Sequence, residues 1–297
     1  RPVGDDTEPW RLTCRLSLKG KSVTRRILIE GRQASGAAID CGGGALGRSG
    51  VETSPGTPTL AIWSRRLETE PGQRPLFSRP TDITIRNCTV HGAIRIWGMG
   101  TRGQIEDLRQ SSRLADHSDY LRRVAPSHVD LLQLTFQATG SIPLYIGPGV
   151  TDVSLSDSRF EGRSVSTAVY LDAESRRSRI TSTVFDIETA REQIAVDGSA
   201  DNVIADNRFD LKGRGGIFLY RNCGEDGVIR HQTPSDNRIT GNVFSGARWI
   251  LPRTVVVGSR EGRRRYCGDD RGWPFGSSLD DGDNASGNIV TGNRAIR

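Results

Sequence analysis

The segments "AVYLDAES" (168–175) and "QIAVDGSA" (193–200) repeat one pattern, in which apolar residues alternate with other side chains and an aspartate ends the run. Asp172 and Asp197 are therefore 25 residues apart. Alternation with a period of two is typical of a β-strand. Because the strands recur at a fixed spacing, the sequence predicts stacked coils in which each strand pairs in parallel with its equivalent one turn later.

Two series of such segments run through the chain. One lies within residues 93–258, and its aliphatic positions are predicted to face inward: Ile94, Ile96, Leu144, Ile146, Val169, Leu171, Ile194, Val196, Ile217, Leu219, Val255 and Val257. The other runs from "DITIRNCTV" (82–90) to "SGNIVTGNR" (286–294), and a small or amide residue turns the chain at Ser158, Thr183, Asn207, Asn242 and Asn293. An aromatic anchor is expected inside each coil, at Phe136, Phe160, Phe185, Phe209 and Phe244.

These two series, recurring every 23–25 residues without intervening helices, resemble the right-handed parallel β-helix of the pectin-lyase-like superfamily. The resemblance covers residues 80–297 and includes the turn residues Asn207, Asn242 and Asn293. It implies an all-β, single-domain solenoid with right-handed coils and a carbohydrate-related activity. Residues 1–79 are expected to form an N-terminal cap and the first coils, and residues 80–297 the β-helix repeats.

The resemblance does not select a reaction, because many chemistries share this fold. The Asn-Thr-Asp, Asp-Asp and His-Gly series of the polygalacturonase branch is absent, and so is the Asp-Pro-His-Glu run of the alginate epimerase branch.

Asp172 and Asp197 should lie one above the other on the outer face, since neighbouring coils are about 4.8 Å apart. Two carboxylates at that distance repel each other. A counter-charge, a metal or a shared proton must relieve the repulsion, and the pKa of one aspartate should rise. The alternative interpretation is that both aspartates cap turns at the ends of their strands.

Three long insertions, residues 99–127, 221–235 and 259–284, leave the same edge of this sheet. They are expected to build walls around a groove, and exposed aromatic rings along it would stack on sugar rings. Alternatively, the aromatic residues form a hydrophobic ladder beneath a loop. The residues expected to bind a glycan are Trp97, Tyr145, Tyr170, Glu174, Glu225, Arg260 and Arg263.

Three functions fit this arrangement. A polysaccharide lyase would use an arginine to neutralise a uronate carboxylate, with a base and an acid moving protons, and the expected residues are Arg221, Tyr220 and His231. A retaining glycoside hydrolase would use Asp172 and Asp197 as acid and nucleophile. A non-catalytic glycan-binding solenoid would need only a platform of aromatic and arginine side chains. An enzyme also needs Asp172, Asp197, Tyr220 and His231 to lie within hydrogen-bond reach of one another.

The charge balance favours the lyase and an acidic polysaccharide or oligosaccharide as substrate. The net charge is +6, and of 41 basic residues only Lys19, Lys21 and Lys212 are lysines. The guanidinium group of arginine suits carboxylate, sulfate or phosphate. No array of basic and aromatic residues indicates a nucleic-acid module. No cofactor is required by these mechanisms, although Asp172, Asp197 and Glu174 could bind calcium.

The sequence also indicates where the protein is expected to be located and which cysteines could pair. No run of about 18 apolar residues predicts a membrane span, and a signal peptide is either absent or already removed. Cys14 with Cys41 and Cys223 with Cys267 could form disulfides, leaving Cys88 in an apolar strand, which would suit a secreted or periplasmic protein. Five unlinked thiols are the alternative.

Overall fold

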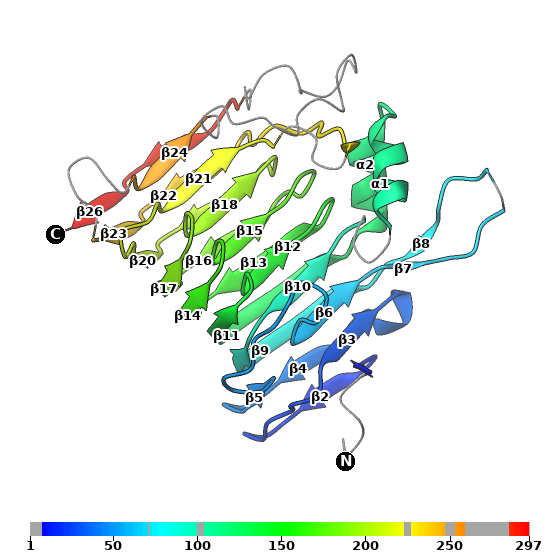
Figure 1. Cartoon of the computed structure of the whole chain (residues 1–297), viewed down its shortest axis with the longest axis horizontal. Helices are drawn as coiled ribbons and strands as arrows, with labels where there is room; N and C mark the ends of the chain where they lie inside the picture. Colours follow the sequence, from blue (N-terminus) through cyan, green and yellow to red (C-terminus); the bar gives the residue numbers. More distant parts are fainter. Residues whose placement is uncertain are drawn as a thin grey trace.

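The computed structural model describes residues 8–70, 72–99, 104–222, 227–246, 253–258 and 285–296. Within them the chain winds into a right-handed parallel β-helix. Nine strands form sheet A and fifteen form sheet B, and equivalent strands of successive coils pair in parallel. Figure 1 shows the strands stacked side by side from β2 near the N-terminus to β26 near the C-terminus. The architecture implied by the sequence resemblance is thus confirmed.

Each coil contributes one strand to sheet A and usually two to sheet B. Sheet A contains β1 (Trp10–Arg11), β3 (Ile27–Glu30), β6 (Leu60–Trp63), β10 (Ile94–Trp97), β12 (Leu144–Ile146), β15 (Val169–Leu171), β18 (Ile194–Asp197), β21 (Ile217–Tyr220) and β24 (Val255–Val257). Sheet B contains β2 (Arg15–Ser17), β4 (Ala38–Asp40), β5 (Ala45–Leu46), β9 (Thr81–His91), β11 (Ser127–Gly140), β13 (Thr151–Ser156), β14 (Arg159–Ser164), β16 (Arg179–Thr181), β17 (Val184–Thr189), β19 (Val203–Ala205), β20 (Arg208–Asp210), β22 (Arg238–Thr240), β23 (Val243–Ser245), β25 (Ile289–Thr291) and β26 (Arg294–Ile296). The strands β7 (Arg65–Arg66) and β8 (Phe77–Ser78) pair antiparallel beside the coils.

The interior is filled by stacked, equivalent side chains. The predicted inward residues of β10, β12, β15, β18 and β21 are at most 1% exposed. The five predicted phenylalanine anchors are also buried, and their rings stack nearly parallel with centroids 4.4–4.9 Å apart. Val257 in β24 differs, because it is 44% exposed among the described residues.

Buried polar side chains hold the corner between the two strands of sheet B. The oxygen Oδ1 of Asn207 accepts a hydrogen bond from the backbone N–H of Thr183 at 3.0 Å, and its Nδ2 donates to Oδ1 of Asn242 at 3.0 Å. Asn242 repeats this arrangement with Asn293. The positive φ of the turn belongs to the preceding residue, 57° at Asp206, so the asparagine points inward and satisfies the backbone that the bend exposes. A second ladder, which the sequence analysis missed, joins Asn202, Asn237 and Asn288.

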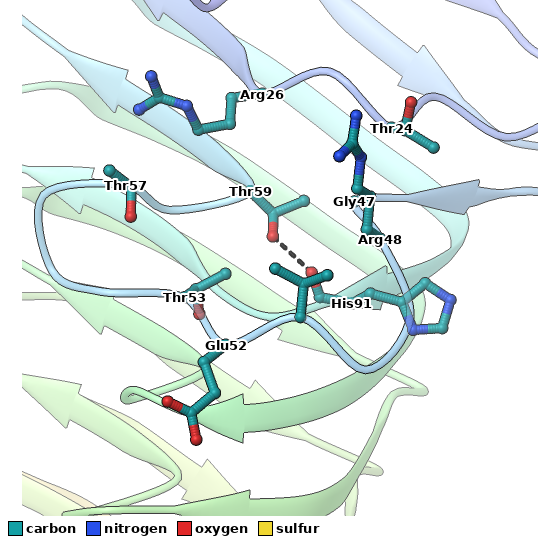
Figure 2. Close-up of a pocket in the computed structure, with 10 residues that line it drawn as sticks. Thr24, Arg26, Gly47, Arg48, Glu52, Thr53, Thr57, Thr59 and His91 are labelled. Carbon is teal, nitrogen blue, oxygen red and sulfur yellow. Dashed lines mark hydrogen bonds between the residues drawn. The ribbon is translucent and has the colours of Figure 1, made fainter. Parts of the chain in front are cut away.

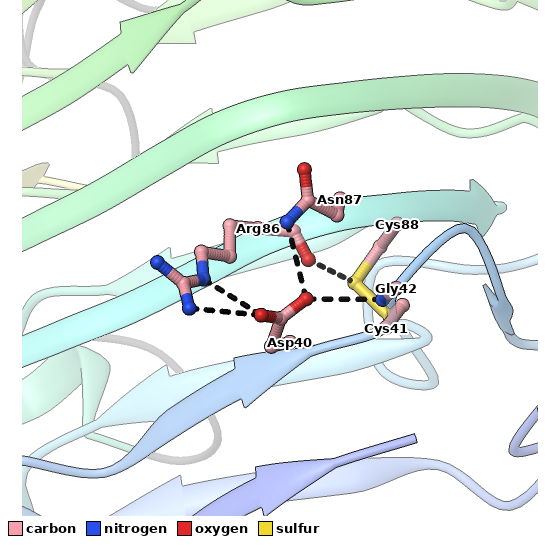
Figure 3. Close-up of a disulfide and its surroundings, with 6 residues drawn as sticks. All are labelled: Asp40, Cys41, Gly42, Arg86, Asn87 and Cys88. Carbon is pink, nitrogen blue, oxygen red and sulfur yellow. Dashed lines mark hydrogen bonds and ion pairs between the residues drawn. A yellow bond between two sulfur atoms is a disulfide. The ribbon is translucent and has the colours of Figure 1, made fainter. Parts of the chain in front are cut away.

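A disulfide joins two N-terminal coils. Cys41, which follows β4, is bonded to Cys88 in β9, and the two strands are hydrogen-bonded neighbours in sheet B (Figure 3). Asp40 lies beside it and accepts hydrogen bonds from Arg86, Asn87 and Gly42. The predicted pairing of Cys14 with Cys41 is wrong, because Cys88 lies on the strand next to Cys41 and Cys14 is an exposed free thiol. Cys223 and Cys267 lie outside the described residues.

The first long insertion contains two short helices rather than an irregular loop. α1 (Ile105–Ser112) and α2 (His117–Val124) lie at one edge of the stacked strands (Figure 1). Leu108, Leu121 and Val228 belong to one buried apolar cluster, so the helices pack against the insertion that follows β21. The backbone N–H of Ile229 also donates to Oγ of Ser112 at 3.0 Å. Two of the three predicted walls therefore contact each other.

Candidate functional site

The two repeated aspartates lie next to each other on the outer face of sheet A. Asp172 follows β15 and Asp197 ends β18, and the two strands pair in register. Nη1 of Arg230 donates to Oδ1 of Asp172 at 2.7 Å and lies 3.4 Å from Oδ2 of Asp197. The repulsion between the carboxylates is therefore relieved by a counter-charge.

Asp197 is completely buried and has several donors. It accepts hydrogen bonds from the backbone N–H and Nδ2 of Asn222, at 2.7 and 2.6 Å, and from the hydroxyl of Tyr170. Burial raises the pKa of Asp197, and the nearby Asp172 raises it further, while Arg230 lowers it in part. The net direction is upward, as the stacked geometry predicted.

Two tyrosines complete the arrangement. The hydroxyl of Tyr145 donates to Asp172 and that of Tyr170 to Asp197, so each tyrosine contacts the aspartate of the next coil. Burial, followed by the adjacent carboxylate, raises the pKa of each phenol well above its usual value. Both phenols therefore stay protonated and donate. We name these five residues, Tyr145, Tyr170, Asp172, Asp197 and Arg230, the tyrosine–aspartate cluster.

A second polar group borders the cluster at Tyr220. The hydroxyl of Tyr220 donates to Oε1 of Glu192 at 2.9 Å and accepts a hydrogen bond from Arg191. Glu192 is 6% exposed and also forms an ion pair with Arg191 at 2.8 Å. Arg191 and Glu192 were not predicted as site residues, because they precede β18 and lie outside the repeated strand pattern. Their adjacent opposite charges were the only local signal.

Two residues predicted to be catalytic, His231 and Arg221, have structural contacts instead of the expected ones. The ring of His231 packs on His117, with centroids 4.9 Å apart, and its Nε2 lies 2.7 Å from the carbonyl oxygen of Ser112. Arg221, expected to neutralise a substrate carboxylate, donates to the backbone carbonyls of Arg230 and His231 and is 7% exposed. These residues fasten the 227–235 segment, because their polar atoms face the chain itself.

Glu174 also turns away from the aspartates. It is 1% exposed and accepts hydrogen bonds from the hydroxyl of Ser118 and the backbone N–H groups of His231 and Gln232. Its carboxylate therefore connects α2 to the 227–235 segment. No group of three or more His, Cys, Asp or Glu side chains among the described residues is arranged to hold a metal ion. The calcium ligand set Asp172, Asp197 and Glu174 is not brought together in this way.

The aromatic residues of the outer face differ in exposure. Trp97 was expected to be exposed but is 3% exposed, and its ring packs against Trp63 with centroids 5.5 Å apart and belongs to a cluster with Leu28 and Ala61. This part of the face matches the hydrophobic-ladder alternative. Tyr145 and Tyr170 remain half-buried, with ring centroids 5.9 Å apart. Glu225, Arg260, Arg263 and the third insertion, 259–284, lie outside the described residues.

A separate cavity of about 210 Å³ opens at the opposite edge of sheet A (Figure 2). Arg26 and Thr59 line it directly before β3 and β6, whereas Asp172 comes after β15. Arg48, Glu52 and His91 add charged and ionisable groups. This cavity was not predicted from the sequence, because the 47–59 connection interrupts the repeat and has no pattern of its own.

No known protein family matches the chain, and no curated protein matches it. One solved structure is similar. It is that of the Streptococcus pneumoniae surface protein and adhesin PfbA, with 12% sequence identity and a TM-score of 0.42, covering 78% of this chain and 69% of that chain. A likeness at this level implies nothing about what this chain binds. No helix in the described ranges has the length and apolar character needed to cross a membrane.

Proposed function

We propose that this chain is a carbohydrate-active β-helix protein that hydrolyses glycosidic bonds at the tyrosine–aspartate cluster. The observation that carries the proposal is the pair of carboxylates facing one arginine nitrogen. The two oxygens that contact this nitrogen lie 2.7 and 3.4 Å from it, so they are at most about 6 Å apart. That bound includes the roughly 5–5.5 Å between the carboxyl groups of retaining glycosidases.

The environments of the two aspartates suggest their roles. Asp197, with its raised pKa, would act as the acid that protonates the leaving oxygen. Asp172, which is 7% exposed and receives hydrogen bonds from Tyr145 and Arg230, would act as the nucleophile. Arg230 is a positioning residue in this scheme, since it keeps both carboxylates in place.

Elimination of a uronate is less well supported than the sequence analysis expected. It requires the polar groups of Arg221, His231 and Tyr220 to reach the aspartates. Their described side-chain contacts are with backbone carbonyls, Ser112 and Glu192 respectively.

A non-catalytic glycan-binding function is the second candidate. It is favoured by the complete burial of Asp197, whose carboxylate already has protein donors at both oxygens. In that case the cluster would anchor Asn222 and the 227–235 segment, and half-buried Tyr145 and Tyr170 would contribute to a sugar platform.

A panel of uronate-containing and neutral polysaccharides tests both candidates. New reducing ends without an unsaturated, ultraviolet-absorbing product support hydrolysis, and new ends with that product establish elimination. Asp172→Asn and Asp197→Asn should each lower the rate by about 10²-fold or more. The matched control is Asp186→Asn, an aspartate paired with Arg159 and Lys212 on sheet B. Binding without new ends supports the non-catalytic function.

The proposal extends to the calcium requirement and to the cellular location of the protein. The panel is run with calcium and with a chelator, and activity is expected to be unchanged because Arg230 already balances the aspartates. The Cys41–Cys88 disulfide favours an oxidising location, so we propose that the protein is secreted or periplasmic. Recovery of the oxidised protein from the medium or periplasm of its host checks this.

A further inference from the structure

A basic cavity of about 420 Å³ lies at the corner where the coils pass from sheet A to sheet B. Its five arginines come from three parts of the chain, and we name it the arginine pocket: Arg79, Arg122, Arg123, Arg176 and Arg177. Two aspartates, Asp119 and Asp152, also line it. Arginine guanidinium groups gathered in this way bind oxyanions such as carboxylate and sulfate through paired hydrogen bonds.

Carboxylates among the described residues pair with four of the five arginines, and two of these pairs join Arg122 to Asp119 at 3.3 Å and Arg176 to Asp201 at 2.5 Å. The remaining positive charge lies mainly on Arg79 and Arg123. Arg177 forms two hydrogen bonds of 2.7 Å with Asp152 and is well paired. Arg79 instead donates to the backbone carbonyl of Arg122 at 3.0 Å and contacts no carboxylate in the described part of the chain. Arg123 lies 3.7 Å from Asp116, a carboxylate that also pairs with Arg74 at 2.7 Å. One acidic group is thus shared between two arginines.

Two further observations concern the guanidinium groups themselves. Arg176 pairs with Asp201 through Nη2, but its Nε is buried without a hydrogen-bond partner. Burial lowers the pKa of Arg122, and the neighbouring Arg176 and Arg177 lower it further, although Glu174 and Asp119 act in the opposite direction. A bound anion would reduce this repulsion between guanidinium groups.

The pocket borders the tyrosine–aspartate cluster. Arg176 follows Asp172 by four residues at the same corner. Nε of Arg122 donates to the backbone carbonyl of Glu174 at 3.3 Å, and its Nη2 donates to Gln232. A polymer bound at the cluster would therefore reach the pocket with a neighbouring unit.

We propose that the arginine pocket binds a carboxylate or sulfate group of an acidic polysaccharide. The proposal rests on the proposed function and names its substrate class. A polysaccharide fits better than a nucleic acid for two reasons. The lining includes the imidazole of His128 but no phenylalanine, tyrosine or tryptophan ring to stack on a base, and Asp119 and Asp152 can accept hydrogen bonds from the hydroxyls that every sugar unit carries.

Binding to uncleaved polymers tests the inference, with polygalacturonate and heparin as carboxylated and sulfated probes and dextran as the neutral one. The test variant is Arg123→Gln/Arg177→Gln, because both side chains are substantially exposed, 62% and 49%, and their loss should not unfold the protein. The matched control is Arg208→Gln/Arg238→Gln, which removes the same charge from exposed positions on sheet B. Thermal unfolding verifies that both variants fold.

The pocket variant should bind the acidic probes at least about tenfold more weakly, with dextran unaffected and the control variant unchanged. An equal loss in both variants would mean that net charge alone acts and would overturn the proposal, as would no loss in either. Duplex DNA binding tighter than either acidic polysaccharide would assign the pocket to nucleic acid instead. Because binding is measured without turnover, arginine-dependent binding with no cleavage would refute only the proposed hydrolysis. Cleavage with arginine-independent binding would refute only the pocket.

Discussion

Arg230 is the residue whose removal should most disturb the tyrosine–aspartate cluster. Its side chain is 13% exposed, and the side chains of its partners Asp172 and Asp197 are 10% and 0% exposed, so water cannot replace the lost charge. Breaking a buried ion pair by removing one partner costs about 3–5 kcal/mol. We therefore expect Arg230→Met to lower the free energy of unfolding by about that amount at neutral pH.

The loss should depend on pH in a defined direction. Asp197 has a folded-state pKa above its unfolded value of 3.8, so its contribution to stability is present at low pH and is lost as the pH rises through the folded pKa. Without Arg230, which lowers this pKa, the folded-state value rises further. The variant should therefore be closest to the native protein under acidic conditions, where the aspartates are protonated, and furthest from it at neutral pH.

Urea unfolding, followed by circular dichroism at acidic and at neutral pH, measures the loss of unfolding free energy in the variant. The control is Arg177→Met, whose ion pair with Asp152 has side chains 49% and 25% exposed, so that water screens it and it should contribute about 1 kcal/mol. Replacing the whole triad, Asp172→Asn/Asp197→Asn/Arg230→Met, should recover much of the loss because no uncompensated charge remains. Equal losses in Arg230→Met and Arg177→Met, or a penalty independent of pH, would refute the interpretation.

Three other perturbations have defined outcomes. Asn207→Ala leaves the buried N–H of Thr183 without its acceptor and should lower the free energy of unfolding by about 1–3 kcal/mol in urea titrations; an unchanged midpoint would contradict the role of the ladder. Cys41→Ser/Cys88→Ser should cost about 2–5 kcal/mol, and a reducing agent should then have no further effect on the unfolding midpoint. Burial lowers the pKa of His117 from 6.5 to about 4, so stability present above pH 6.5 should be lost as the pH falls towards 4, by up to about 3 kcal/mol. His117→Phe should flatten that dependence. In the native protein, an NMR titration in which the imidazole of His117 stays neutral well below pH 6.5 would confirm the lowered pKa as the cause.

The coil architecture could be predicted from the sequence because each coil repeats the same pattern of inward apolar residues and turn residues. Alternation placed Val169 and Ile194 inside the coil, and the recurring Asn207 and Asn242 marked the corner. The stacking of Asp172 on Asp197 followed directly from the register. These features depend on residues one coil apart, which the repeat spacing reveals.

Contacts made by the insertions could not be predicted in the same way. Arg230 reaches Asp172 across 58 residues, and no periodicity connects them. The helices α1 and α2 are eight residues each, and helices this short depend on packing against partners such as Val228 rather than on intrinsic propensity. Cys88 was correctly predicted to lie in an apolar strand. Its disulfide partner could not be predicted, because the neighbouring strand belongs to the first coils, where the repeat is irregular.

The hydrogen bonds between coils run along the axis of the stack, and this has a mechanical consequence. Tension applied to the two ends of the described coils would load these bonds one coil at a time, so the molecule should lengthen in steps rather than at once. A coil such as that from Asp172 to Asp197 contains 25 residues and would release about 85 Å of extended chain. Arg230, which holds two coils together, and the Cys41–Cys88 bond, which cannot be pulled apart without breaking a covalent bond, would interrupt this regular series. The protein would then resist stretching unevenly, most strongly at the positions where distant parts of the chain are fastened across coils.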